Sequence, residues 1–265
     1  MGILQNENAI PSASGGGGFY SHQITNSCRF DGNDGGLRFG GASGVLGTPT
    51  NVDKGTLACW MKRSFIGNAW KTIFHSHTGS SGRNIAFDYN NTDDTIGMDD
   101  FGNSTSVFRD VSGWNHFVFA FDTTQSSNND RCKVYFNGSY LNQFNSTVSQ
   151  NTDVKFFVGG NRFYVGYNEG TGNDFAFEGY MTEVIYVDGQ QLAPTAFGET
   201  KNSVFIPIDY AGTYGNNGFR LEFKQSGTGA DASGLGADTS GNNHHFSLIN
   251  MGADHQVLDS PTFGS

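Results

Sequence analysis

The chain has 265 residues, enough for one large β domain or two small ones. Its formal net charge is −10, and its 15 Lys and Arg residues are scattered, which argues against nucleic-acid binding because phosphate contacts need clustered positive charge. No stretch approaches the roughly 18 apolar residues that span a bilayer, and residues 1–11 lack the basic start and apolar run of a secretory signal.

The composition favours an all-β protein made in the cytoplasm. The chain contains 24 Phe and 10 Tyr but only 5 Met, so its core must be aromatic. Its 38 Gly, together with many Asn, Ser, Thr and Asp, supply tight turns rather than helices. Without an export or membrane-spanning segment, we expect no membrane insertion.

Three regions follow one another along the chain. Residues 1–23 show little periodicity and include Gly15-Gly-Gly-Gly18, which predicts an extended arm. Residues 24–198 hold the strand-like runs of an antiparallel sandwich. Residues 199–265 have too few such runs for an independent core, which favours an extension packed on the sandwich over an incomplete second module.

The first half of residues 24–198 is a series of short strand-like runs separated by polar turns. In the strongest run, Leu57, Cys59 and Met61 alternate with Ala58 and Trp60, which predicts two buried faces. The runs are Asn26–Phe30, Leu37–Phe39, Gly55–Arg63, Trp70–His77, Asn84–Tyr89 and Thr95–Phe101.

The second half contains four fragments that we interpret as consecutive antiparallel strands. The first is apolar on both alternating faces, and the second ends on Asn137-Gly138, the strongest short hairpin signal. The fragments are Trp114–Asp122, Lys133–Gly138, Phe157–Gly160 and Phe177–Gly189. The core predicted from them is Trp114, Phe117, Phe119, Val134, Phe136, Val184 and Tyr186.

The remaining elements are short. Ala193–Gly198 predicts about one turn of helix, and Phe219–Phe223 and His245–Ile249 predict two further strands.

The order of the four fragments resembles a known family. Trp-x-His with an apolar strand and Asp, then Val-Tyr-Phe-Asn-Gly, a Gly-Gly pair and Phe-x-Gly-Tyr-x-x-Glu-Val are similar to the laminin-G-like, concanavalin A-type lectin and glucanase jelly roll. The resemblance covers about Ser27 to Asp188. It implies an antiparallel β-sandwich, here followed by a short β-rich C-terminal extension.

A narrower resemblance implies a biological setting. The segments 179–184, 187–199, 210–219, 235–244 and 259–262 are similar to virion structural proteins of tailed bacteriophages, especially marine and cyanobacterial ones. This implies a non-enzymatic part of the particle, as head decoration or tail or fibre component, made in the host cytoplasm. Its partners would be other virion proteins and copies of itself. The alternative is an adhesion module that binds a host surface polysaccharide.

Glycoside hydrolysis is the least favoured function. The glucanases of this fold use two carboxylates on one strand, in a Glu-x-Asp-x-x-Glu motif that this chain lacks. Glu178 and Glu183 are five residues apart, so on a regular strand they would point to opposite faces. We therefore expect no enzyme activity.

A sugar site needs an aromatic ring beside polar groups, because the ring stacks on the pyranose while amides and charges bond its hydroxyls. Ordinary packing explains the same residue types equally well. The candidates for glycan binding are Trp70, Asn161, Arg162, Tyr164 and Tyr167.

No cofactor is required by any motif. Related domains often bind Ca²⁺ through loop oxygens, and Asp122 with Asp130 is the first place to look for such a site. His75 and His77 alternate onto one strand face, but no third metal ligand is identifiable. The odd number of cysteines, all in strand-like runs, predicts three free thiols rather than a disulfide.

Overall fold

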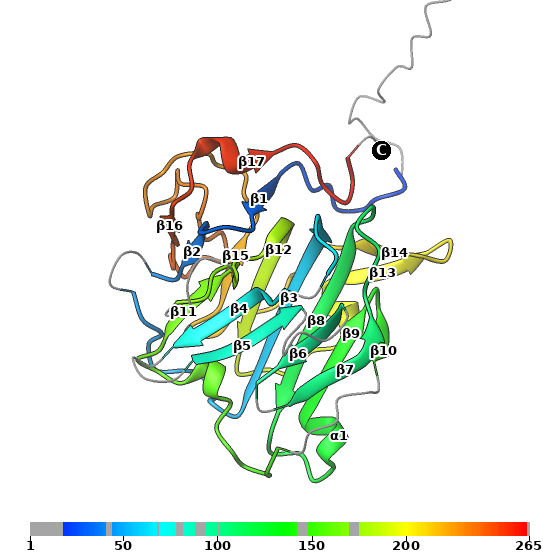
Figure 1. Cartoon of the computed structure of the whole chain (residues 1–265). Coiled ribbons are helices and arrows are strands. Elements are labelled where there is room, and N and C mark those ends of the chain that lie inside the picture. Colours follow the sequence, from blue (N-terminus) through cyan, green and yellow to red (C-terminus); the bar gives the residue numbers. More distant parts are fainter. Residues whose placement is uncertain are drawn as a thin grey trace, which may run out of the picture.

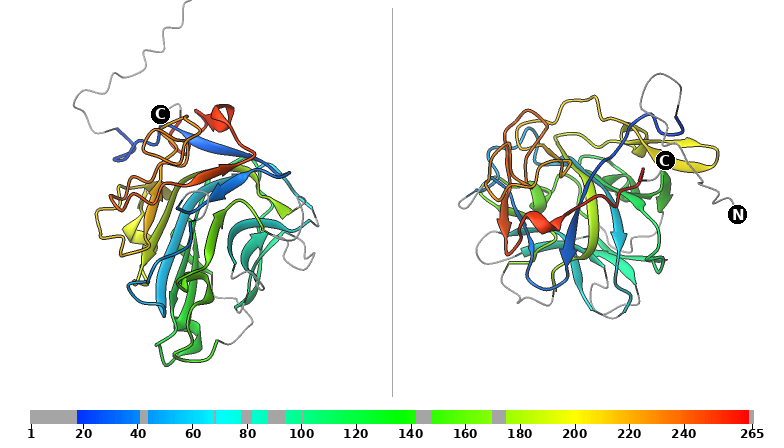
Figure 2. Two further views of the ribbon diagram at one scale, coloured as in Figure 1. Left: turned by 90° about the vertical axis from the view of Figure 1, so that its left-hand side faces the viewer. Right: turned by 90° about the horizontal axis from the view of Figure 1, so that it is seen from above.

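The structure, a computed structural model, describes residues 18–40, 44–67, 69–77, 82–87, 94–99, 101–141, 148–169 and 175–263. In these ranges two large sheets lie face to face, and every ladder between named strands is antiparallel (Figures 1 and 2). An antiparallel β-sandwich, as predicted, is therefore the architecture.

Sheet A has the order β10 (Ser139–Leu141), β9 (Cys132–Phe136), β8 (Asn115–Asp122), β3 (Lys54–Arg63), β12 (Glu178–Asp188), β1 (Ser27–Asp31) and β17 (Gln256–Val257), with β15 (Phe219–Leu221) also paired to β12. Sheet B has the order β16 (Ser247–Ile249), β2 (Gly36–Arg38), β11 (Arg162–Val165), β4 (Lys71–His77), β5 (Gly82–Phe87), β6 (Thr95–Met98) and β7 (Gly102–Val107).

A separate hairpin joins β13 (Gly198–Lys201) to β14 (Val204–Pro207), and the short helices are α1 (Asn128–Arg131), η1 (Lys155–Phe157), η3 (Pro194–Ala196) and η4 (Ala253–His255). β15, β16 and β17 lie after residue 198 and pair with β12, β2 and β1, so the C-terminal region adds strands to both sheets. The region boundaries after residues 23 and 198 stay a prediction.

The core between the sheets is built from aromatic side chains on the alternating inner positions. Phe119 is fully buried, and its ring packs edge-on against that of Phe74 in sheet B, with 6.2 Å between centroids. Leu57, Cys59 and Met61 belong to this core, as predicted. Alternation places one side chain of every pair inside and the other outside.

The outer face of sheet A is covered as well. Ala58, Val118 and Ala120 are buried there under Phe197, and Phe205 of the β13–β14 hairpin stacks at 6.1 Å on the ring of Trp60. The predicted double burial of the strand after Trp114 is therefore confirmed. The cover also buries His116, whose ring lies 5.3 Å from that of Phe205.

The hairpin prediction is also confirmed. β9 and β10 are joined by Asn137 and Gly138, with φ angles of +47° and +78°. Two consecutive left-handed residues are what a type I′ turn requires, and its twist matches that of the flanking strands. At Gly138 a Cβ would lie 2.7 Å from the Phe205 ring, so this position also requires a residue without a side chain.

Several local predictions are wrong. Phe157–Gly160 is not a strand: Lys155–Phe157 forms a 3₁₀ turn, because two consecutive Phe side chains both enter the core. The last of the four fragments, β12, lies between β3 and β1 rather than beside its predecessors. Trp114 and Phe136 are half-buried, whereas the other predicted core residues are buried.

A β-bulge interrupts β12 between Thr182 and Ile185. Met181 and Val184 both face the core, so the alternation shifts by one residue at Glu183, which has a left-handed φ of +47°. Because the strand is not regular, the prediction that Glu178 and Glu183 point to opposite faces does not hold.

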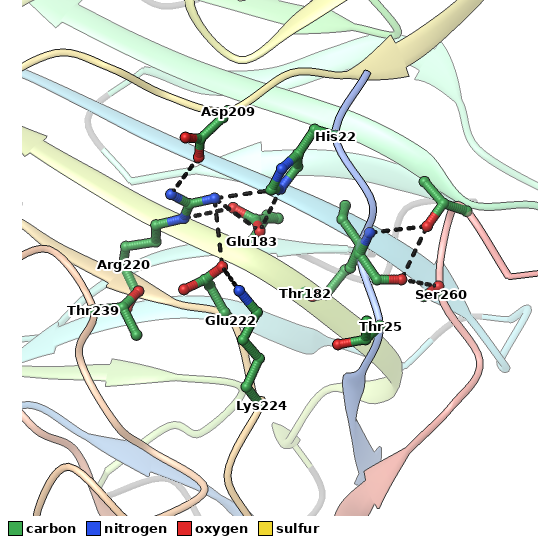
Figure 3. A network of polar contacts seen from close by, with 12 residues as sticks. His22, Thr25, Thr182, Glu183, Asp209, Arg220, Glu222, Lys224, Thr239 and Ser260 are labelled. Carbon is green, nitrogen blue, oxygen red and sulfur yellow. Dashed lines mark hydrogen bonds and ion pairs between the residues drawn. The ribbon is translucent and has the colours of Figure 1, made fainter. Parts of the chain in front are cut away.

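Glu183 belongs to a polar network on the outer face of sheet A (Figure 3). The Arg220 guanidinium donates to Glu183 at 2.8 Å and to Asp209 at 2.7 Å, and lies 3.6 Å from Glu222. His22 is 3.1 Å from the same Glu183 carboxylate. A charge as buried as that of Arg220 is tolerated only with such partners.

Both ends of the described chain cross the top of the sandwich together (Figures 1 and 2). The Ile24 amide donates to Thr262 Oγ1 at 2.9 Å, and Ser260 Oγ donates to the Ile24 carbonyl at 2.6 Å. Of the predicted arm, residues 1–17 lie outside the described residues. Residues 18–23 lie against the body, where Lys201 donates to the carbonyl of Phe19 at 2.8 Å.

The three cysteines are free thiols, as predicted. Cys28 and Cys59 are buried, and Cys132 is partly buried. Burial raises the pKa of all three thiols, so they act as small apolar groups.

Candidate functional site

A row of polar side chains crosses the outer face of sheet B. Residues directly opposite each other on antiparallel strands point to the same face. The opposed pairs are Ser247 with Arg38, Arg38 with Tyr164, Tyr164 with His75, and His75 with Asn84. Four strand spacings separate its ends, so this polar row is about 19 Å long.

The segment after β11 lies over the polar row from β2 to β5. Asn168 donates to Asn84 Oδ1 at 2.9 Å and to Thr72 Oγ1 at 3.3 Å. The Tyr167 ring contacts the Tyr164 ring, with 5.6 Å between centroids. A Cβ at Gly36 would collide with Tyr167, so this glycine lets the tyrosine lie directly on β2.

The Glu169 carboxylate contacts charged and phenolic side chains at this face. Its carboxylate accepts from Tyr164 Oη at 2.5 Å and from Arg162 at 2.6 Å, and lies 3.5 Å from His77. Burial pushes the pKa of Glu169 upward, but the hydrogen bond from Tyr164 and the charge of Arg162 outweigh it and leave that pKa below its usual range. Burial, with the Glu169 hydrogen bond, raises the pKa of Tyr164. At neutral pH this is an ionised carboxylate held by a neutral phenol.

His75 is neutral and its tautomer is set by its neighbours. Burial lowers the pKa of His75 to about 4, against the hydrogen bond to Asn84, which favours the protonated form. Asp99 accepts from Asn84 Nδ2 at 3.2 Å, which turns Asn84 Oδ1 toward His75 Nδ1 at 2.8 Å. Nδ1 therefore carries the proton, and Nε2 is an acceptor.

Polar atoms without partners concentrate at this face. Buried polar atoms in folded proteins almost always have a hydrogen-bond partner, so each exception asks for an explanation. On the outer face of sheet B, four buried atoms in the described part of the chain lack one: Arg38 Nε, His75 Nε2, Asn168 Oδ1 and Ser247 Oγ. Both donors and acceptors are thus left over within one strip of surface.

The structure brings three of the five sequence candidates together. Arg162, Tyr164 and Tyr167 join the polar row, with Arg162 largely exposed and Tyr164 buried. Asn161 is buried and donates to Ser76 Oγ and the Lys155 carbonyl, so its amide is used within the fold. Trp70 precedes β4 and packs edge-on against Phe175, with 5.3 Å between centroids.

The calcium candidates are occupied by protein donors. Asp122 accepts from Thr124 and Gln125 and pairs with Lys54 at 3.2 Å, while Asp130 pairs with Lys133 at 3.0 Å. Within the described ranges, no group of three His, Cys, Asp or Glu side chains is placed to hold a metal ion. Over the same ranges, no helix is long and apolar enough to cross a membrane.

Sequence reasoning missed most of the row. Arg38, Asn84 and Ser247 come from distant segments, and strand register is needed to align them. Asn168 and Glu169 directly follow Tyr167 in sequence and reach the row through hydrogen bonds to Asn84 and Tyr164. One signal was present, since Arg38 alternates with two buried apolar neighbours and so must face outward.

Comparison with known proteins shows similarity at the level of the fold. No family model matches the chain, and no curated protein matches it significantly. Among solved structures, a Bacteroides ovatus protein to which carbohydrate binding is attributed superposes with a TM-score of 0.57 at 15% identity. The match covers 91% of this chain and 62% of that one. The fold is a lectin-like jelly roll.

Two further solved structures are similar over a smaller part of this chain. The heptameric SAP-like pentraxin of Limulus polyphemus gives a TM-score of 0.44 at 16% identity, covering 65% of this chain and 80% of the pentraxin. Domain 4 of an extracellular arabinanase from Geobacillus stearothermophilus, solved with arabinotriose, gives 0.43 at 18%, covering 64% and 73%.

Proposed function

We propose that this protein is a non-catalytic carbohydrate-binding module whose ligand lies along the polar row of sheet B. The observation that carries the proposal is the concentration of unpartnered polar atoms on this one face. The fold similarity to a protein to which carbohydrate binding is attributed supports the same function.

The chemistry of the polar groups on this face suits a saccharide. Sugar hydroxyls both donate and accept, and the row leaves a donor at Arg38 and acceptors at His75 and Asn168. The partly exposed Tyr167 ring offers an apolar surface for a sugar ring. Arg162 and Glu169, both at the surface, supply a charged pair that can bond vicinal hydroxyls.

The carboxylates of this face favour binding over hydrolysis. Hydrolysis of a glycosidic bond needs a proton-donating carboxylic acid and a second, free carboxylate. Glu169 is held ionised by Arg162 and Tyr164, and Asp99 is tied to both nitrogens of Asn84. We therefore propose a binding role without turnover.

A glycan array tests the binding proposal. The wild-type protein should bind at least one class of host-surface oligosaccharide, and Tyr167→Ala should weaken that binding by roughly tenfold, about 1.4 kcal/mol. Tyr140→Ala removes a tyrosine that is 43% exposed on sheet A, and should leave binding unchanged. If the wild type binds no glycan, or both variants bind alike, this face is not a sugar site.

For the biological setting we propose a tailed-phage particle, on the strength of the sequence resemblance to virion structural proteins. The module would be made in the host cytoplasm and assembled beside other virion proteins, as head decoration or tail component. Mass spectrometry of purified particles tests this, and absence of the chain from them would refute it. Deletion of residues 1–17 should weaken incorporation if the predicted arm contacts a neighbour.

A further inference from the structure

Among the strand arginines of the described ranges that are at least half-buried, Arg38 differs from the others in having no partner. Arg63 pairs with Asp94 at 3.0 Å, and Arg162 pairs with Glu169 at 2.6 Å. For the half-buried Arg38, in contrast, the described part of the chain supplies neither a carboxylate nor a hydrogen-bond acceptor, and its Nε lies buried. Burying part of a guanidinium without a counter-ion costs free energy. The unpaired Arg38 therefore points to an anion that binds from outside the chain.

The residues around Arg38 form a binding site for a small anionic group. Ser247 lies opposite it on β16, and its Oγ is also buried without a partner. Tyr164 lies opposite on β11. Tyr167 packs over Gly36, two residues before Arg38 on the same face of β2. The guanidinium of Arg38, the hydroxyl of Ser247 and the ring of Tyr167 thus lie together at one end of the polar row.

We propose that the saccharide is acidic, and that Arg38 binds the carboxylate of a uronic acid residue. The guanidinium donors lie in one plane, and a planar carboxylate accepts two of them side by side. Ser247 Oγ donates to the same carboxylate or to the neighbouring ring hydroxyl. The sugar ring then lies beside Tyr167, and the chain of the saccharide continues along the row toward Arg162.

This inference rests on the proposed function and extends it to the class of ligand. The test uses an array of uronate-containing oligosaccharides beside the same compounds with every carboxylate converted to its methyl ester, and beside sulfated oligosaccharides. The ester keeps the sugar and removes the charge. The wild-type protein should bind the free acids at least tenfold more tightly than the esters.

Variants assign the effect to Arg38. Arg38→Gln should weaken binding of the acids about tenfold and leave binding of the esters unchanged, and Arg38→Lys should lie between because it keeps the charge but not the fork. Arg29→Gln, the same change at an exposed arginine of sheet A, should have no effect. Thermal unfolding checks each fold, and if Arg38→Gln is unstable, Arg38→Lys and Ser247→Ala carry the comparison.

The outcomes separate the two proposals. If esters and acids bind equally and Tyr167→Ala weakens both, the carbohydrate-binding function stands and the acidic ligand is refuted. Acid binding that survives Arg38→Gln, or binding to sulfated but not to uronate compounds, also overturns the assignment. If no oligosaccharide of any kind binds, the proposed function itself has failed.

Discussion

Replacing Phe119 by Ala tests the central packing of the sandwich. Phe119 is at the middle of β8 with no exposed surface. Its ring packs edge-on against Phe74 of the opposite sheet and stacks on Phe117 of its own strand, with 6.3 Å between centroids. The substitution therefore removes contacts both within one sheet and across the interface between the two.

The expected loss follows from these contacts. Removing a fully buried phenyl ring forfeits about 2–3 kcal/mol of hydrophobic transfer free energy. The cavity left in a core of neighbouring rings, and the two lost ring pairs, bring the total to about 3–5 kcal/mol. That is a large part of the roughly 5–15 kcal/mol by which a domain is stable.

Urea denaturation followed by tryptophan fluorescence measures the change in the free energy of unfolding. The control is Phe263→Ala, where the ring is 68% exposed and the change should stay within about 0.5 kcal/mol. A loss below about 1 kcal/mol for Phe119→Ala would mean that β8 does not lie in the core and that the sheet order is wrong.

Three further predictions concern stability and thiol chemistry. Arg220→Met should cost about 3–5 kcal/mol, because it removes the guanidinium that neutralises the buried Glu183 carboxylate and leaves only His22 beside it, whereas Arg162→Met at a 48% exposed side chain should cost less than about 1 kcal/mol in the same denaturation assay. Burial lowers the pKa of His116 to about 3 and that of His75 to about 4 from an ordinary 6.5, so between pH 6.5 and 5 the unfolded chain binds protons that the folded chain does not. The free energy of unfolding should therefore fall with falling pH in this window, by up to about 1.4 kcal/mol per unit for each histidine, and His116→Phe should reduce the slope; a flat profile would contradict the buried, neutral rings. Titration in denaturant without reductant should find all three cysteines as free thiols, and a value of one per chain would require a disulfide.

The sequence predicts those strands well whose pattern is local. The two-faced burial around Trp60 and Phe119 and the turn at Asn137 depend only on neighbouring residues, and the structure has them. Sheet order depends on pairing across the whole chain, which no local pattern encodes. The position of β12 between β3 and β1 could therefore not be predicted from the sequence. The bulge at Glu183 also shifts an alternation that was assumed to be regular.

The candidate site was predictable only in part, for the same reason. Arg162, Tyr164 and Tyr167 are close in sequence and could be chosen for their side-chain chemistry alone. Arg38 and Ser247 are brought together by the pairing of β2 with β16, two short strands more than 200 residues apart. Their missing hydrogen bonds are a property of packing and leave no trace in composition.

The crossing of the two chain ends has a consequence for the order of folding. Ile24 and Thr262 are 238 residues apart, yet they share hydrogen bonds, and β17 is the outer neighbour of β1. Loop closure over so long a distance is entropically slow, and such contacts form late. On the ribosome, the meander from β8 to β10 can pair as soon as it emerges, whereas β1 must wait with one edge open until residue 257 has been synthesised. The nascent chain thus carries an unprotected strand from the synthesis of residue 31 until that of residue 257, and slower translation would prolong its exposure to aggregation.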